Sequence, residues 1–277
     1  MLIEKKLSKL AEITGSKLIG EDSKFSKIST DTRLLKKGDL FLALKGENYD
    51  GHDFIEAAIE KGASSIISEI ELDYQINYIK TKNNFNFLKL LAKKVKANFK
   101  GIIFAITGSN GKTSTKEITY RLLSRFFEQK KIFKSPKNWN NELGLYFSLL
   151  DLEASHEIAV FELGTNSPGE IFFLSKFLNP DNGVLTNIGH AHLENLKSLE
   201  GVAEEKSDIF LNVRKDGNCF ARVDDKFKEI IINKSEGKKL HFLEEINEDA
   251  YSSNFDISFQ SINEALNLKI SIEEKNR

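Results

Sequence analysis

The stretch Ile102-Ile103-Phe104-Ala105-Ile106-Thr107-Gly108-Ser109-Asn110-Gly111-Lys112-Thr113 decides the fold of this chain. Its first half is a run of apolar residues, typical of a strand that is buried on both faces. Its second half is rich in glycine, which lets the backbone bend so that consecutive N–H groups face one anion. Gly-x-x-Gly-Lys-Thr is a shortened form of the phosphate-binding P-loop, because Ile106 stands where the longer pattern has glycine.

The P-loop pattern predicts binding of a nucleoside triphosphate with magnesium. Lys112 would reach the outer phosphates, and the hydroxyl of Thr113 would bind Mg²⁺. The helix that begins at Lys112 would add its positive end. The same string can also be an ordinary strand–turn–helix junction, but its place after a buried strand favours phosphate binding. The residues expected to contact the nucleotide are Gly108, Ser109, Asn110, Gly111, Lys112, Thr113 and Ser114.

Strand-like and helical segments alternate regularly after the P-loop. This alternation predicts an α/β fold with a mostly parallel sheet and helices on both faces. The expected strands are 101–107, 158–163 and 183–188, and the expected helices are 112–127, 170–177 and 199–211.

A smaller α/β unit precedes the P-loop region. Its expected helices are 2–13 and 53–62, and its expected strands are 39–44, 64–68 and 76–81. We therefore expect an N-terminal domain over residues 1–82 and a central P-loop domain over residues 83–277, which the helix 83–99 opens. Beyond residue 244 the pattern weakens, and residues 255–272 alternate in the manner of edge strands.

Charge and cysteine usage exclude several classes of protein. Forty basic and 41 acidic side chains give a net charge of −1, so no overall field draws the chain to nucleic acid or to a membrane. The single cysteine, Cys219, excludes an internal disulfide and a cysteine-based zinc site. The N-terminus lacks a signal-peptide pattern, and no apolar run is long enough to span a bilayer. We expect a cytoplasmic protein without a nucleic-acid or membrane partner.

Polar residues follow the predicted strands of the central domain, where an open α/β sheet places its ligands. Glu162 follows four apolar residues, and a carboxylate in that position is costly to bury unless it is paired or binds a metal. His190 and His192 follow the next strand, and Lys206 lies in the helix after it. Taken singly, Glu162 could cap a turn, while His190 reads as structural and Lys206 as a solvated charge; His192 stays open. Their order after a P-loop favours a cation site.

Four stretches together resemble the ATP-dependent Mur ligases of peptidoglycan synthesis. Ser135-Pro-Lys-Asn-Trp-Asn-Asn-Glu-Leu-Gly144 narrows the match, because it resembles the asparagine-rich loop of the branch that adds D-alanyl-D-alanine to UDP-N-acetylmuramoyl-tripeptide. Parts of residues 29–54 resemble the nucleotide-sugar domain that this branch shares with the diamino-acid-adding ligases. The similarity runs from about residue 20 to about residue 225. The four stretches are Thr107–Ser114, Glu162–Gly164, Asn187–Glu194 and Val202–Lys206.

The resemblance implies a reaction and its cofactors. ATP would phosphorylate the carboxylate of the tripeptide to an acyl phosphate, and the amine of D-alanyl-D-alanine would attack it to give an amide. ATP and two Mg²⁺ ions are implied. The implied catalytic residues are Lys112, Glu162, His192 and Lys206. Thr113 and Glu162 would hold one ion, His192 would help to hold the second, and Lys206 would serve as a carbamate ligand formed with carbon dioxide.

The resemblance also implies substrate contacts, although the chain departs from the family in places. Asn141 and Thr165 match positions near the substrate, Thr32 matches a contact to the uridine nucleotide, and His190 matches no assigned role. Tyr146 stands where the family commonly has proline, and Arg222, within Ala221-Arg-Val-Asp-Asp225, puts the expected adenine contact in doubt.

Nothing after residue 225 resembles the C-terminal domain of the family. We therefore expect a truncated or split ligase, weak or inactive alone, whose missing domain a separate chain could supply. The alternatives are a diamino-acid-adding ligase, which the asparagine-rich loop disfavours, and a non-catalytic nucleotide-binding remnant. A P-loop switch protein has less support, since no Asp-x-x-Gly follows the loop. The sequence leaves open the third residue of the acceptor peptide, the oligomeric state and the modification of Lys206.

Overall fold

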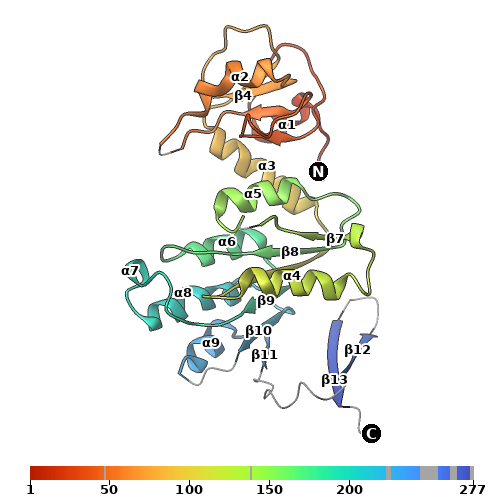
Figure 1. Ribbon diagram of the computed structural model, residues 1–277, viewed down its shortest axis with the longest axis vertical. Helices are drawn as coiled ribbons and strands as arrows, with labels where there is room; N and C mark the ends of the chain where they lie inside the picture. Colours follow the sequence, from red (N-terminus) through yellow and green to blue (C-terminus); the bar gives the residue numbers. More distant parts are fainter. Residues whose placement is uncertain (47, 138, 223–225, 244–254, 263–266, 275–277) are drawn as a thin grey trace.

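The computed structural model describes residues 1–46, 48–137, 139–222, 226–243, 255–262 and 267–274. Two α/β units with a long helix between them make up most of the molecule (Figure 1). The expected α/β class with mostly parallel sheets is confirmed, because most neighbouring strands in both larger sheets run parallel.

The first sheet has the strand order β1-β5-β4-β3-β2. β2 to β5 run parallel, and β1 joins the edge antiparallel to β5. Side chains alternate between its two faces, so Leu40 and Leu42 of β3 pack on the side of α1, whereas Phe41 packs on the side of α2. The strands are β1 (Lys17–Ile19), β2 (Ile28–Ser29), β3 (Leu40–Leu42), β4 (Ser65–Ser68) and β5 (Tyr78–Lys80). The helices are α1 (Leu7–Thr14), the 3₁₀ turn η1 (Gly51–Phe54) and α2 (Ile55–Glu60).

The first helix begins later than the apolar spacing predicted. The expected helix 2–13 is wrong at its N-terminal end, since α1 begins at Leu7. The preceding backbone pairs with a distant segment instead: Lys6 forms a β-bridge with Lys24, and the N–H of Phe25 donates to the carbonyl of Lys5. Long-range pairing therefore replaces the first helical turn.

The second sheet has the strand order β11-β10-β9-β6-β8-β7, and all of these strands are parallel. The central position of β6 places the P-loop at the carboxyl edge in the middle of the sheet. The strands are β6 (Ile102–Thr107), β7 (Ile132–Lys134), β8 (Ile158–Glu162), β9 (Asn182–Leu185), β10 (Asn218–Arg222) and β11 (Lys239–Leu243). The helices are α4 (Lys112–Leu123), the turn η2 (Gln129–Lys131), α5 (Glu142–Leu150), α6 (Glu170–Leu178), α7 (Leu193–Leu196), α8 (Leu199–Leu211) and α9 (Lys228–Lys234).

Two predicted boundaries in this sheet need correction. The helix after the P-loop ends at Leu123 rather than at Phe127, because the N–H groups of Arg125 and Phe126 turn back to carbonyls three residues earlier. The expected strand 183–188 ends at Leu185, because the residues that follow bind the P-loop instead of a neighbouring strand.

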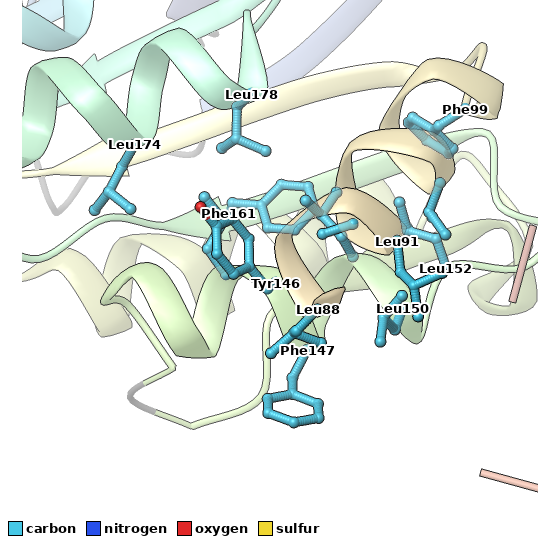
Figure 2. Packing of buried hydrophobic residues seen from close by; sticks show 14 of the residues in the cluster. Leu88, Leu91, Phe99, Tyr146, Phe147, Leu150, Leu152, Phe161, Leu174 and Leu178 are labelled. Atoms are coloured by element: carbon cyan, nitrogen blue, oxygen red, sulfur yellow. The ribbon is translucent and has the colours of Figure 1, made fainter. Parts of the chain in front are cut away.

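The helix α3 (Asn84–Asn98) connects the two sheets through one continuous hydrophobic core. Figure 2 shows Leu88 of α3 beside Phe147 of α5 and Leu91 of α3 beside Leu150 of α5, with Phe161 of β8 in the same cluster. Leu7 and Leu10 of α1 belong to this cluster too. Since α3 shares its core with both sheets, the division of the chain at residue 82 stays a prediction.

The segment expected to form edge strands forms a separate antiparallel hairpin. β12 (Phe255–Ile262) pairs with β13 (Asn267–Glu274) along their whole length, and the two make a sheet of their own. In the part of the chain that the structure describes, no helix combines the length and the apolar character needed to cross a bilayer.

Candidate phosphate and cation site

The P-loop links the end of β6 to the start of α4, as predicted. Gly108 has φ +149°, and a Cβ atom there would lie 1.8 Å from Oγ1 of Thr186, so only glycine fits. Gly111, with φ +77°, directly precedes α4, and no side chain caps that helix start. The first turn of α4 therefore presents N–H groups without a capping side chain, the arrangement in which helices bind anions.

Residues 186–189, of which 186–188 belong to an expected strand, form hydrogen bonds that hold the P-loop in shape. The hydroxyl of Thr186 donates to the carbonyl of Asn110 over 2.6 Å, and the N–H of Asn110 donates to Oδ1 of Asn187 over 2.9 Å. The N–H of Ser109 donates to the carbonyl of Asn187, and the hydroxyl of Ser109 bonds the backbone of Gly189. The loop conformation is thus fixed by a neighbouring strand end, without a bound ligand.

Glu162 lies at the carboxyl end of β8, beside the P-loop. Its side chain is 2% exposed, yet both oxygens have partners. The hydroxyl of Thr113 donates to Oε2 over 2.9 Å, and Nδ2 of Asn140 donates to Oε1 over 3.0 Å. A buried carboxylate requires such partners, because an unpaired buried charge is strongly unfavourable.

Lys116, which the sequence analysis did not single out, is the cation next to Glu162. Its side chain is fully buried, and its Nζ lies 3.5 Å from Oε2 of Glu162. It also donates a 2.7 Å hydrogen bond to the carbonyl of Lys137. Its spacing could have indicated this role, since Lys116 lies three and four residues after Thr113 and Lys112 and so shares their helix face.

Lys112 brings a further amine near this carboxylate, and the charge of Lys112 in turn acts on the amine of Lys206. Nζ of Lys112 donates to the carbonyls of Gly108 and Ser109, over 2.8 and 3.2 Å. Burial lowers the pKa of Lys112, and the charge of Glu162 opposes that shift. Burial and, to a smaller extent, the charge of Lys112 lower the pKa of Lys206 to about 8, and Glu205 opposes the shift.

Lys206 is only 1% exposed, so the simple view of it as a solvated charge is wrong. Among the described residues, no hydrogen bond or ion pair holds its amine. Its neighbour Glu205 is buried as well: its carboxylate accepts from the N–H of Gly169 over 2.6 Å and from the N–H of Ile171 over 2.8 Å. Glu205 thus caps α6 from a different helix, which helical spacing alone could not reveal.

A cavity of about 410 Å³ opens beside these groups. It brings together four of the predicted residues, Lys112, Asn141, Thr165 and His192, although they come from four separate segments. The remaining lining residues are Asn140, Glu142, Gly164, Asn166, Pro168, Gly169, Glu170, Phe173 and Leu174.

The predicted residues of this cavity also have structural partners. Oδ1 of Asn141 accepts from the N–H of Gly144 over 2.8 Å and so caps α5. The hydroxyl of Thr165 donates to the carbonyl of Ser167 over 2.8 Å. His192 precedes α7 in a left-handed conformation, with φ +55°. Tyr146 is buried, and its hydroxyl donates a 2.5 Å hydrogen bond to Glu142, the first residue of α5.

Other predicted residues lie apart from this cavity or contribute no contact to it. Thr32 follows β2 in the first unit, where its carbonyl accepts from Nζ of Lys61 over 2.9 Å. Ser114 and His190 are exposed and do not line the cavity. Arg222 is the last residue of β10, and residues 223–225, where the sequence analysis doubted the expected adenine contact, lie outside the described residues.

The side chains at the P-loop fit a magnesium ion that a phosphate ligand completes. Thr113 and Glu162 offer a hydroxyl and a carboxylate oxygen, the donors that Mg²⁺ prefers. Within the described ranges, no group of three or more His, Cys, Asp or Glu side chains could hold a metal. This donor set suits Mg²⁺, which typically binds through one or two protein groups together with water and substrate phosphates.

Two protein-family models match the chain. The Mur ligase middle domain matches residues 106–274, and the Mur ligase family catalytic domain matches residues 24–96. A UDP-N-acetylmuramoyl-tripeptide–D-alanyl-D-alanine ligase of Rickettsia prowazekii (strain Madrid E) is 40% identical over 208 residues, which are 72% of this chain and 45% of the relative. The ligase of the same name from Escherichia coli (strain K12) is 35% identical over 223 residues, 80% of this chain and 49% of the relative.

Solved structures of the same kind share the fold. A MurF crystal structure from Acinetobacter baumannii has a TM-score of 0.75 at 31% identity, covering 84% of this chain and 52% of that one. MurF ligase from Thermotoga maritima, in complex with ADP, has a TM-score of 0.68 at 33% identity, covering 79% and 50%. The chain spans about half the length of the relatives that it matches. Since the middle-domain match alone covers more than half of its residues, the chain belongs to the Mur ligase family.

Proposed function

We propose that this chain forms the phosphate-binding and acceptor-binding part of an ATP-dependent ligase that adds D-alanyl-D-alanine to UDP-N-acetylmuramoyl-tripeptide. The observation that carries the proposal is the 2.9 Å contact between Thr113 and Glu162, at the start of an uncapped P-loop helix and beside a cavity lined by Asn140 and Asn141. The names of the two ligase relatives and the ADP complex of a similar structure support it.

The P-loop residues would bind and orient the ATP phosphates. The free N–H groups at the start of α4 would face the phosphate oxygens, and Lys112 would move from the carbonyls that it now contacts to the outer phosphates. Thr113 and Glu162 would hold one Mg²⁺, and His192 would help to hold a second. The bound ions would neutralise the charge between the γ-phosphoryl group and the attacking carboxylate.

Lys206 fits the role of a carbamate ligand. A buried amine with a pKa of about 8 is neutral far more often than an ordinary lysine, and only the neutral amine attacks carbon dioxide. The new N–C bond, with loss of one proton, turns the amine into an anion. Lys112, whose charge acts on Lys206, would then attract that anion instead of repelling a cation.

The cavity would position the reacting carboxylate of the peptide. Asn141 and Thr165 line it together with Lys112, so a carboxylate there would lie next to the phosphate loop. We place the uridine nucleotide at Thr32 in the first unit. The diamino-acid-adding reaction is the second candidate, because that branch shares the nucleotide-sugar domain; the names of the matched relatives favour D-alanyl-D-alanine.

The proposal is tested by coupled phosphate release and by the mass of the product. The chain would be incubated with ATP, Mg²⁺ and either UDP-N-acetylmuramoyl-tripeptide plus D-alanyl-D-alanine or the dipeptide nucleotide plus a diamino acid. Because the chain spans about half of its relatives, each reaction is run alone and with the remaining half of a relative added.

We expect phosphate release and amide product only with D-alanyl-D-alanine and the tripeptide nucleotide, and none with Lys112→Ala. Turnover with the diamino acid alone would replace the first candidate by the second. Nucleotide binding without turnover in any mixture would favour the hypothesis that the chain is a non-catalytic nucleotide-binding remnant.

A further inference from the structure

The buried amine of Lys116 joins three segments that meet at the cation site. It lies on the P-loop helix α4, it is 3.5 Å from Oε2 of Glu162 at the end of β8, and it donates to the carbonyl of Lys137 over 2.7 Å. Lys137 belongs to the asparagine loop, by which we mean the described residues 135–137 and 139–141. Among the described residues, neither Lys112 nor Lys206 contacts both Glu162 and the asparagine loop.

The Lys116 contact reaches the asparagine loop at a strained residue. Lys137 adopts a left-handed conformation, with φ +38°, which is unfavourable for a residue with a side chain. That conformation belongs to a turn in which the N–H of Trp139 donates to the carbonyl of Pro136 over 3.0 Å. The carbonyl of Lys137 thereby reaches Lys116, and this bond helps to offset the strain of the turn.

The same loop supplies two hydrogen-bond partners of Glu162, Asn140 and Ser135. Nδ2 of Asn140 donates to Oε1 of Glu162, and the carbonyl of Asn140 accepts from the N–H of Gly164 over 2.8 Å. The N–H of Glu162 itself donates to the hydroxyl of Ser135 over 3.1 Å. Lys116 therefore influences the carboxylate of Glu162 in two ways. Its charge attracts the carboxylate directly, and its hydrogen bond to Lys137 holds the loop that carries Asn140.

We propose that Lys116 is a positioning residue of the phosphate site: it balances the charge of Glu162 when no cation is bound, and it fixes the asparagine loop on the P-loop helix. The part of this inference that concerns the cation rests on the proposed function. Lys116 would keep the Glu162 carboxylate paired and oriented toward the P-loop, ready to bind a cation.

The position of the loop is tested by the fluorescence of Trp139, the single tryptophan of the chain. This ring is partly exposed, and its centroid lies 5.7 Å from that of Phe147. Lys116→Met should increase acrylamide quenching of Trp139 about twofold, and Lys116→Arg, which keeps the charge and a donor, should restore part of the protection. Lys134→Met is the control, since Lys134 contacts Glu117 and Tyr120 of the same helix but not Glu162.

The charge balance is tested by thermal unfolding with EDTA and with Mg²⁺. Because Glu162 loses its cation in Lys116→Met, added Mg²⁺ should raise the Tm of this variant by several degrees more than that of the wild type or of Lys134→Met. A lysine with a packing role alone would lower Tm equally in both solutions. If Mg²⁺ raises the Tm of Lys116→Met, Lys134→Met and the wild type equally, and if the quenching of Trp139 is unchanged in Lys116→Met, the proposal is overturned.

The double variant Lys116→Met/Glu162→Gln keeps the test valid if Lys116→Met does not fold. Because it removes both charges, it should fold and should be more stable than Lys116→Met. A double variant that fails to fold, or that is no more stable than Lys116→Met, would overturn the pairing. The quenching and the double variant need neither nucleotide nor metal, so a failure of nucleotide binding would contradict the proposed function and leave these results standing.

Discussion

Three ionisable side chains of the second unit are buried: Lys116, Glu162 and Lys206. They differ in whether an ion-pair or hydrogen-bond partner compensates their charge. Lys116 and Glu162 lie together, and each has further hydrogen-bond partners. Lys206 lacks such a partner among the described residues, and burial lowers its pKa to about 8. The paired groups are suited to hold a fixed geometry, whereas the unpaired amine is available for chemistry.

Lys206 should make stability depend on pH in a defined direction. Its folded pKa of about 8 lies below the ordinary value of 10.5, so the unfolded chain binds more protons between these values and stability rises with pH there. Below pH 8 the burial penalty is fully present, at about 3 kcal/mol. Lys206→Met should therefore be more stable than the wild type near pH 7, and the difference should shrink towards pH 10.

Urea unfolding at both pH values in buffer free of carbon dioxide measures this effect. The exposed Lys239→Met serves as the control and should show no such convergence. A constant difference between Lys206→Met and the wild type across this pH range would contradict the assigned pKa.

The two P-loop glycines should respond differently to alanine. At Gly108 the added Cβ would lie 1.8 Å from Thr186, so the loop must move, and we expect a cost of about 2–4 kcal/mol. At Gly111 no atom lies within 4 Å of the added Cβ, and only the positive φ is unfavourable, at about 1 kcal/mol. Chemical unfolding of the two variants compares them directly, and equal losses would show that Thr186 does not constrain the loop.

At the scale of elements, the start of α6 forms one wall of the cavity and depends on a carboxylate from α8. Glu205 accepts two short hydrogen bonds from backbone N–H groups there, so Glu205→Ala should cost about 2–3 kcal/mol. Glu204→Ala is the matched control, because Glu204 is half exposed and pairs with Lys234, an interaction worth under about 1 kcal/mol.

Urea unfolding and amide hydrogen exchange check this prediction. Faster exchange at Gly169 and Ile171 in Glu205→Ala, but not in Glu204→Ala, is the expected result. Similar losses in the two variants would show that the cap does not hold the cavity wall.

The order of these elements could be predicted from sequence wherever apolar periodicity is strong. The helix 199–211 and the strand before the P-loop match closely, because both present a regular apolar pattern. The strands β7, β10 and β11 and the helices α5, α7 and α9 were not predicted. Helix α5 is buried over most of its length, so its apolar run lacks the amphipathic period that indicates a helix.

The candidate site was predictable only in part. P-loop spacing indicated Lys112 and Thr113, whereas the resemblance to a family was needed for His192 and Lys206. The buried roles of Lys116 and Glu205 were not predicted, because charged residues on a helix usually face solvent. Their partners here lie in distant segments of the chain.

At the scale of the whole molecule, α3 ties the first sheet to the P-loop sheet through one apolar core (Figure 2). Its residues Leu88 and Leu91 pack beside α5, the helix that Asn141 caps at the cavity. The geometry of the cavity therefore depends on packing between the two units. The proposed uridine site at Thr32 would lie in the first unit, and the proposed phosphate site in the second.

Calorimetric titration of ADP into the wild-type chain, with Mg²⁺ and then with EDTA, tests the central claim most directly. Parallel titrations would use Lys112→Ala and Glu162→Gln. We predict binding that weakens at least about tenfold without Mg²⁺ and by a similar factor in each variant, since a 1.4 kcal/mol loss corresponds to tenfold. Binding that is indifferent to Mg²⁺ and unchanged in both variants, or no binding by the wild-type chain, would contradict the phosphate and cation site.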